Sequence, residues 1–447
     1  MVSRSFKTGL GVAFALAILV GCSEEELILP GERFDVRDRG EGAAVAVVEQ
    51  GPGVAEGPPP SVELPPARLN ASWTHAGGNA AHTIAHPVLD RELQSVWSAS
   101  IGEGNSRGHR ITADPVVADG RVFTKDSRAL ISAFSLSGER LWTRDLTPAS
   151  DQSNDASGGG LAVSEGVLFA TSGFGTLTAM DAATGAVRWT QALNAAATGA
   201  PTVSGDRVFV ATRNGIGWAI DTSNGRILWE VLGRRGPAGL VGGPGPSIAG
   251  PLVIFPFASG QVIAAGINTG APTWGASVAG RDATRAFSVI SDLTGAPVVD
   301  STRLYAGSHA GRVAAVSLAS GEVEWTAQVG ALNPIWLGGN SVFFVSPESV
   351  LTRLDAATGQ QYWSVELPFF EESRANRLKS TFVHYGPVLA GGRLIVASDD
   401  GLLREFDPVS GALLSETELG RGAARNPVVA GGVLYLVTED GQIRAFR

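Results

Sequence analysis

The stretch Ser137-Gly138-Glu139-Arg140-Leu141-Trp142 decides the fold, because the chain repeats its pattern. A Ser, Thr or Asn followed by glycine recurs with a tryptophan four residues after the glycine, at a period of roughly 40 to 50 residues. Further copies begin at Thr184, Asn224, Thr269, Ser320 and Thr358, and a copy at Ser410 carries Ser415 at the tryptophan position. This period predicts one supersecondary unit that is repeated along the chain.

Each unit reads as two hairpins. An alternating apolar segment such as Ala179-Met180-Asp181 precedes the repeated turn, whose glycine supplies the positive φ of a tight hairpin. A second hairpin lies upstream, as in Pro115 to Phe123, and the repeats show no long helical period. Inner strands begin near Pro115, Leu161, Pro201, Pro246, Pro297, Pro334, Pro387 and Pro427. The sequence therefore predicts an all-β fold, an eight-bladed β-propeller of four-stranded antiparallel blades.

The ends of the chain predict how the ring closes. The last unit stops after its third strand, at Gln442 to Arg447, and an orphan strand around Trp97 precedes the first unit. We expect this N-terminal strand to complete the last blade, which would leave no open end in the ring. The repeated tryptophans could stack on a sugar or a cofactor, but their fixed outer-strand position favours packing between neighbouring blades.

The N-terminus has the layout of a bacterial secretory signal. Arg4 and Lys7 precede the apolar run Leu10 to Val20, which is too short to span a bilayer as a helix. Cys22 is the only cysteine, so one molecule can form neither a disulfide nor a multi-cysteine metal site.

Leu19-Val20-Gly21-Cys22 resembles the lipobox of bacterial lipoproteins, although a chance cysteine near an ordinary cleavage site is the alternative. The resemblance implies a signal peptide at residues 1–21 and acyl chains on Cys22, which anchor a protein to a membrane. Ser23, in place of an Asp, favours the outer membrane. Residues 22–70 are rich in Pro, Gly, Glu and Ala and predict a flexible tether, and residues 71–447 form the propeller.

Irregular connections concentrate on one face. The long connections, at 145–160, 232–245, 275–296 and 364–386, each run from one blade to the next and emerge on the same face. They mix Arg, Leu and Phe, as in Leu232-Gly233-Arg234-Arg235-Gly236, Arg281 to Phe287, and Phe369-Phe370-Glu371-Glu372 with Arg374, Arg377 and Lys379. This composition favours a protein-binding surface, and solvated loops without a partner are the alternative.

Several function classes find no support. The net charge of −9 and the lack of a basic stripe argue against a nucleic-acid partner. His82 and His86 have a spacing that binds metals on a helix, but Pro87 opposes a helix there, and we interpret the six histidines as surface residues. No nucleophile elbow or phosphate loop is present, so we predict no metal, no cofactor and no catalytic residue.

The repeat resembles that of the quinoprotein (PQQ-like) propellers, which makes a PQQ-dependent dehydrogenase the competing enzyme hypothesis. In those alcohol dehydrogenases an adjacent Cys-Cys disulfide lies over the quinone, and acids with an Asn hold Ca²⁺ beside it. This chain has one cysteine and no Cys-x-x-Cys-His haem site. We therefore predict that it is not an enzyme.

Lipobox, tether and eight blades without a quinone site together resemble the BamB family of lipoproteins. Pro30-Gly31-Glu32-Arg33 and Trp73 to Gly78 are similar to its alphaproteobacterial branch. The resemblance implies a scaffold of the outer-membrane β-barrel assembly complex, anchored to the outer membrane and facing the periplasm. It also implies two partners, the POTRA domains of a BamA-like barrel protein and nascent outer-membrane proteins. A holdase that binds unfolded strands by β-augmentation is an alternative.

The family's contact residues follow a Leu-x-Leu-Arg-Gly pattern in one blade connection and Asp-x-Asp in the next. Leu232 and Arg235 match the first pattern, with Arg234 in place of the second Leu. Asp292 matches the second pattern, with Thr294 in place of the second acid. The resemblance therefore implies partner binding by Leu232, Arg234, Arg235 and Asp292, with Arg235 pairing with an acid and Leu232 filling an apolar pocket.

Overall fold

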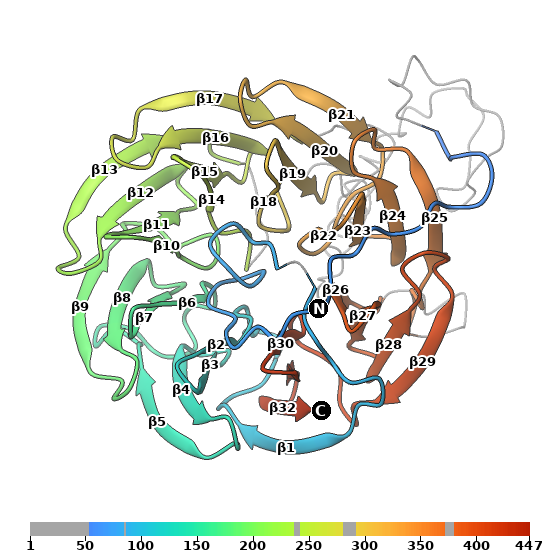
Figure 1. Ribbon diagram of the computed structural model, residues 1–447. Coiled ribbons are helices and arrows are strands. Elements are labelled where there is room, and N and C mark those ends of the chain that lie inside the picture. The colour runs from blue at the N-terminus through green and yellow to red at the C-terminus, as the bar shows by residue number, and fades with distance from the viewer. Residues whose placement is uncertain (1–52, 85, 237–241, 280–291, 372–379) are drawn as a thin grey trace, which may run out of the picture. The chain divides into compact units, whose positions relative to one another are not determined.

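The structure is a computed structural model that describes residues 53–84, 86–236, 242–279, 292–371 and 380–447. Within these ranges the strands form eight four-stranded antiparallel sheets around one axis (Figure 1). The predicted eight-bladed β-propeller is confirmed. In the same ranges no helix has the length and apolarity to cross a bilayer. Cys22 and the predicted signal peptide lie outside the described residues.

The strands follow one order in seven blades, from the axis outward. Blade 1 holds β2 (Val116–Ala118), β3 (Arg121–Lys125), β4 (Leu130–Ser135) and β5 (Arg140–Asp145). Blade 2 holds β6 (Leu161–Ser164), β7 (Val167–Thr171), β8 (Thr176–Asp181) and β9 (Val187–Ala192). Blade 3 holds β10 (Thr202–Ser204), β11 (Arg207–Ala211), β12 (Ile216–Asp221) and β13 (Ile227–Leu232). Blade 4 holds β14 (Ser247–Ala249), β15 (Leu252–Pro256), β16 (Gln261–Gly266) and β17 (Pro272–Ser277).

The remaining blades repeat this order. Blade 5 holds β18 (Val298–Val299), β19 (Arg303–Ser308), β20 (Arg312–Ser317) and β21 (Val323–Ala327). Blade 6 holds β22 (Trp336–Gly338), β23 (Ser341–Val345), β24 (Val350–Asp355) and β25 (Gln361–Glu366). Blade 7 holds β26 (His384–Ala390), β27 (Arg393–Ser398), β28 (Leu402–Phe406) and β29 (Leu413–Glu418). Blade 8 holds β30 (Val428–Ala430), β31 (Val433–Thr438) and β32 (Gln442–Phe446), and its outer strand is β1 (Ser95–Ser100).

Blade 8 joins the two ends of the propeller. Strand β1 pairs antiparallel with β32, with Trp97 opposite Ala445 and Ser100 opposite Gln442 (Figure 1). The predicted closure by the N-terminal strand is therefore confirmed. Because β1 bonds to β32, the outer edge of β32 is paired and blade 8 has four strands like the other blades.

Each outer-strand tryptophan lies on the turn glycine of the next blade. A Cβ atom on Gly185 would stand 2.5 Å from Trp142, and Gly138 faces Trp97 in the same way at 2.7 Å. The same contact occurs at Gly225, Gly270, Gly321, Gly359 and Gly411. Five of the seven indoles also donate a hydrogen bond to a turn carbonyl of that blade, as Trp189 Nε1 does to Thr222 O at 2.9 Å. The predicted packing of the tryptophans between blades is thus confirmed, and the surface that each tryptophan packs against is the turn glycine of the next blade.

Ser415 stands at the one tryptophan position that has no such turn to face. The next blade is blade 8, whose third and fourth strands belong to opposite ends of the chain and share no hairpin. An indole there would have no turn glycine to lie on, and Ser415 Oγ instead donates to Glu405 Oε2 at 2.7 Å. The departure from the repeat therefore follows from the closure.

This contact makes a prediction about two glycines that share a φ of +71°. Gly185→Ala places a methyl group against Trp142, whereas Gly166→Ala meets no atom within 4 Å. We expect both variants to lose about 1 kcal/mol from backbone strain, and Gly185→Ala to lose a further ~1–3 kcal/mol from overpacking. Chemical denaturation of the two variants measures the difference. Equal losses of unfolding free energy in the two variants would contradict a tight contact between Trp142 and Gly185.

Residues 53–94, which we call the strap, run from the outer edge of blade 6 to the inner strands of the ring and back out to β1. They contact every blade of the ring through one or more hydrogen bonds. The blade atoms that bond the strap include Val117 O and N–H, Val163 N–H, Val203 N–H, Ile248 N–H, Pro297 O, Arg353 Nη2, Gly391 N–H and Gly431 N–H. Residues 53–70, which we expected within a flexible tether, contribute two of these contacts, since Pro60 O accepts from Arg353 and Asn70 O from Gly431.

The strap buries two of the histidines that we interpreted as surface residues. His75 and His82 are each 5% exposed, and His384 of blade 7 is fully buried. Val203 N–H donates to His75 Nε2 at 3.0 Å, and His82 Nδ1 bonds Pro297 O at 3.0 Å. The interpretation was wrong for these three residues. The sequence gives no sign that the strap packs on His75 and His82, and the ring of His384 bonds Ser398 Oγ and Pro368 O inside the propeller. Burial lowers the pKa of His75 to about 3 and that of His82 to about 4.

These values predict a loss of stability in acid. Both imidazoles stay neutral in the folded chain, while in the unfolded chain they take up protons below pH 6.5. Stability is therefore complete above pH 6.5 and falls as the pH drops toward 4, by about 2 kcal/mol per histidine at pH 5. Denaturant titrations at pH 8 and pH 5 should show a smaller pH effect in His82→Gln than in the unmodified chain. An identical pH effect in both would contradict this assignment.

Candidate partner-binding face

The connections between blades and the hairpins between second and third strands share one side of the ring, which we call the loop face. Backbone bonds tie the two kinds of loop together, as Leu146 N–H donates to Ala129 O and Leu367 N–H to Ser349 O. The repeated turns and the strap contacts at Gly391 and Gly431 belong to the other side, the turn face. The connections that differ most between repeats in length and composition lie on the loop face, and a binding site is expected there.

The β13–β14 connection holds three of the four predicted contact residues. Leu232 ends β13 and is 75% exposed, the most exposed large apolar side chain among the described residues. Gly233 N–H donates to Gly215 O at 2.8 Å, and a Cβ on Gly233 would stand 2.4 Å from the Phe257 ring. The glycine therefore lets the connection lie directly on the neighbouring hairpin, and this contact holds Leu232 at the surface.

Two arginines extend this exposed segment. Arg234 N–H donates to Gln261 Oε1 at 3.0 Å, and Arg235 Nε donates to Asn214 O at 2.9 Å. Both residues remain exposed. The bonds fasten the segment to blade 3 on one side and blade 4 on the other, so an apolar group and two cations are presented on a fixed backbone. Such a group of side chains suits an acidic and apolar protein surface.

Asp292 lies in a different setting. It lies near the end of the β17–β18 connection, and only 3% of it is exposed. Its carbonyl accepts the His309 N–H at 3.1 Å, and the neighbouring Thr294 hydroxyl bonds Ala331 O. The structure thus gathers Leu232, Arg234 and Arg235 at the surface and buries Asp292, whose role in partner binding stays a prediction.

Other predicted surface residues are only partly described. Arg281 to Phe287, Glu372, Arg374, Arg377 and Lys379 lie outside the described residues. Phe370 is 41% exposed and packs against Phe369 with ring centroids 4.7 Å apart. The 101–115 connection also belongs to the loop face, and the sequence reasoning missed it because it precedes the first complete repeat.

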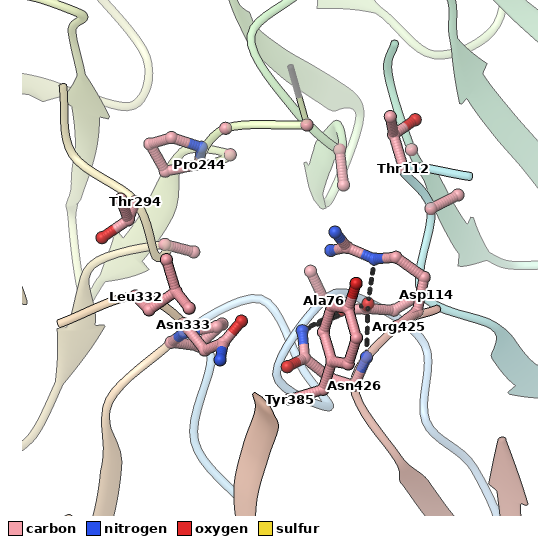
Figure 2. A pocket seen from close by; sticks show the side chains of 18 of the residues that line it. Ala76, Thr112, Asp114, Pro244, Thr294, Leu332, Asn333, Tyr385, Arg425 and Asn426 are labelled. Atoms are coloured by element: carbon pink, nitrogen blue, oxygen red, sulfur yellow. Dashed lines mark hydrogen bonds and ion pairs between the residues drawn. The ribbon is translucent and has the colours of Figure 1, made fainter. Parts of the chain in front are cut away.

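An axial cavity of 340 Å³ lies where the inner ends of the blades meet (Figure 2). Its wall includes a residue that lies one to three positions before the inner strand in seven of the eight blades. Four of these residues are small: Gly160, Ala200, Gly245 and Ala296. The other three are polar: Asp114, Asn333 and Asn426. The strap contributes Ala76 to the lining, and Thr112, Val383, Tyr385 and Arg425 are shared with a wider outer chamber of 760 Å³.

Acids dominate the outer chamber. Glu371, Asp399 and Glu439 line it together with Arg110 and Arg425, and Arg110 lies 3.8 Å from Glu439. Burial, with the charges of Glu439, Asp400 and Glu371 adding to it, raises the pKa of Asp399 to about 6. The Val383 N–H that bonds this carboxylate only partly opposes the shift. The chamber therefore favours cationic groups at neutral pH.

The axial cavity does not fit a quinone with its calcium ion. Asp114 is the acid in its wall, and Arg425 Nε and Asn426 Nδ2 already hold that carboxylate at 2.8 and 3.1 Å. Among the described residues no three His, Cys, Asp or Glu side chains gather as metal ligands. The sole cysteine, Cys22, lies far before the blades in sequence, so no cysteine pair can cover a quinone here.

Comparison with known proteins gives one consistent family. The chain matches the family model described as outer membrane protein assembly factor BamB over residues 127–365 and 349–447. The outer membrane protein assembly factor BamB of Moranella endobia is 24% identical over 333 residues, which are 73% of this chain and 83% of that protein.

Solved structures share the fold. BamB from Moraxella catarrhalis superposes with a TM-score of 0.66 at 21% identity, covering 80% of this chain and 100% of that one. Quinohemoprotein alcohol dehydrogenase from Comamonas testosteroni gives 0.66 at 16% identity, covering 85% and 81%. At these identities the likeness concerns the propeller alone and does not extend to its chemistry.

Proposed function

This chain belongs to the BamB family of outer membrane protein assembly factors, and from that premise we propose that it is a non-enzymatic scaffold in outer-membrane protein assembly. In this proposal the loop face binds the periplasmic POTRA domains of a BamA-like barrel protein. Cys22 carries acyl chains that hold the chain at the outer membrane, on the periplasmic side, while nascent outer-membrane proteins are folded and inserted.

The observation that carries the proposal is the fixed, exposed group formed by Leu232, Arg234 and Arg235. An apolar side chain that is 75% exposed on a well-bonded backbone has most of its surface available for burial by a partner. The two arginines beside it add charge-assisted bonds to acids of that partner. Preorganisation by Gly215, Phe257 and Gln261 lowers the entropy lost on binding.

A second candidate function, the holding of unfolded outer-membrane proteins, has one observation in its favour. Val54 forms a parallel bridge with Gln361 on the outer edge of blade 6, where Ala55 N–H donates to Gln361 O at 2.8 Å. An outer blade edge therefore accepts an extended segment of chain. The same edge chemistry on other blades would bind unfolded strands by β-augmentation.

Capture from membranes tests the scaffold. The full chain, with Cys22 intact, is purified from detergent-solubilised membranes as the unmodified form and as Leu232→Asp with Arg235→Glu. The paired change replaces the apolar group and reverses one charge without touching a buried residue, so we expect at least about tenfold less BamA-like protein in the eluate. Quantitative blotting measures the yield.

A matched pair on the turn face serves as the control. Leu136→Asp with Arg226→Glu changes an equally apolar and an equally charged exposed residue, and it should retain the unmodified yield. Undiminished capture by the Leu232 and Arg235 variant would exclude this surface. Recovery of many different outer-membrane proteins, in place of one principal partner, would favour the holding function.

A further inference from the structure

Arg425 offers two unused nitrogen atoms to the axial cavity. Its Nε donates to Asp114 Oδ1 at 2.8 Å, and the guanidinium is fixed in this orientation because Asp114 also accepts from Asn426. Figure 2 shows the terminal nitrogens of Arg425 turned toward the open centre of the cavity. Among the described residues neither Nη atom has a hydrogen-bond partner. A fixed guanidinium with two free N–H groups is the donor pair that binds a carboxylate.

Two further polar groups face the same space. Asn333 is 7% exposed, and its Nδ2 donates to His384 O, while its Oδ1 has no partner within the described part of the chain. The Tyr385 hydroxyl likewise makes no hydrogen bond to a described residue. Burial raises the pKa of Tyr385 to about 12, so the hydroxyl keeps its proton and can donate it in a hydrogen bond. Arg425 and Tyr385 are partly exposed and these atoms face an open cavity, so water or a ligand can bond them.

The surroundings narrow the ligand class. Asp114 offsets the charge of Arg425 and repels a doubly charged phosphate more than a singly charged carboxylate, which makes the carboxylate the better match. Asn333 Oδ1 accepts an N–H, as a peptide amide would offer. The outer chamber with Glu371, Asp399 and Glu439 favours a cationic group farther out. Ala76 of the strap lines the inner side, so a chain is accepted end first, from the loop face.

We propose that the axial cavity binds the carboxy-terminal end of a peptide with a basic side chain. The terminal carboxylate accepts hydrogen bonds from Arg425 Nη1 and Nη2 and from the Tyr385 hydroxyl. An amide N–H of the peptide donates to Asn333 Oδ1. The basic side chain lies among the acids of the outer chamber. A volume of 340 Å³ is at the lower end of the range of about 300–1,000 Å³ for small-molecule sites, which suits a terminal pair of residues.

Isothermal titration of the full chain with alanyl-lysine tests the proposal without any partner protein. We expect saturable binding at one site, weakened at least about tenfold for alanyl-lysine amide, which lacks the carboxylate. Alanyl-norleucine, which lacks the ammonium, should bind more weakly than alanyl-lysine. A ten-residue peptide ending in Ala-Lys distinguishes the sources: equal affinity supports the end of a protein chain as ligand, and much weaker affinity supports a free short peptide.

Two variants and one control locate the site. Arg425→Gln should weaken alanyl-lysine binding at least about tenfold, and Tyr385→Phe, which removes a single hydroxyl and leaves the Asp114 contacts intact, about threefold. Arg421→Gln changes an exposed arginine of the same connection and should bind as the unmodified chain does. No saturable binding, equal binding of the amide, or unchanged binding by a folded Arg425→Gln variant would overturn the proposal.

Discussion

The contact of each outer-strand tryptophan with the turn glycine of the next blade is the interaction on which the rest of the structure depends. An indole is large enough to bury substantial apolar area and flat enough to fill the space that a glycine leaves. The contact is made seven times with one geometry, from Trp97 on Gly138 to Trp363 on Gly411. It therefore fixes the position of each blade relative to the next, and the turn glycine cannot take a side chain without disturbing it.

This contact keeps the turn face uniform from blade to blade and leaves the loop face variable. Tryptophans, glycines and the strap occupy the turn face and the blade interiors, where their contacts leave little room for new surface chemistry. The loop face carries no such contact, so its connections differ in length and composition. The exposed group around Leu232 and the polar wall of the axial cavity both lie where the repeats differ from one another. A rigid ring with variable loops on one side is a suitable frame for binding other proteins.

The repeat allowed the blades, their strand order and the closing role of the strand around Trp97 to be predicted, because each depends on local pattern and chain length. The strap was missed, since its residues lack periodicity and form bonds only with distant blades. The buried state of His75 and His82 follows from those long-range contacts and was missed for the same reason. A signal for the axial cavity was present: the residue before the predicted start of each inner strand is small in most units and polar at Asp114, Asn333 and Asn426.

The central claim is that the loop face, held rigid by the blades, receives the partner. Hydrogen–deuterium exchange of the full chain, with and without the periplasmic domains of the BamA-like protein, tests it most directly. The account predicts slower exchange at amides 232–236 and 257–261 on complex formation, with no change at the turns 182–185 and 222–225. Protection confined to those turns or to the strap would contradict it.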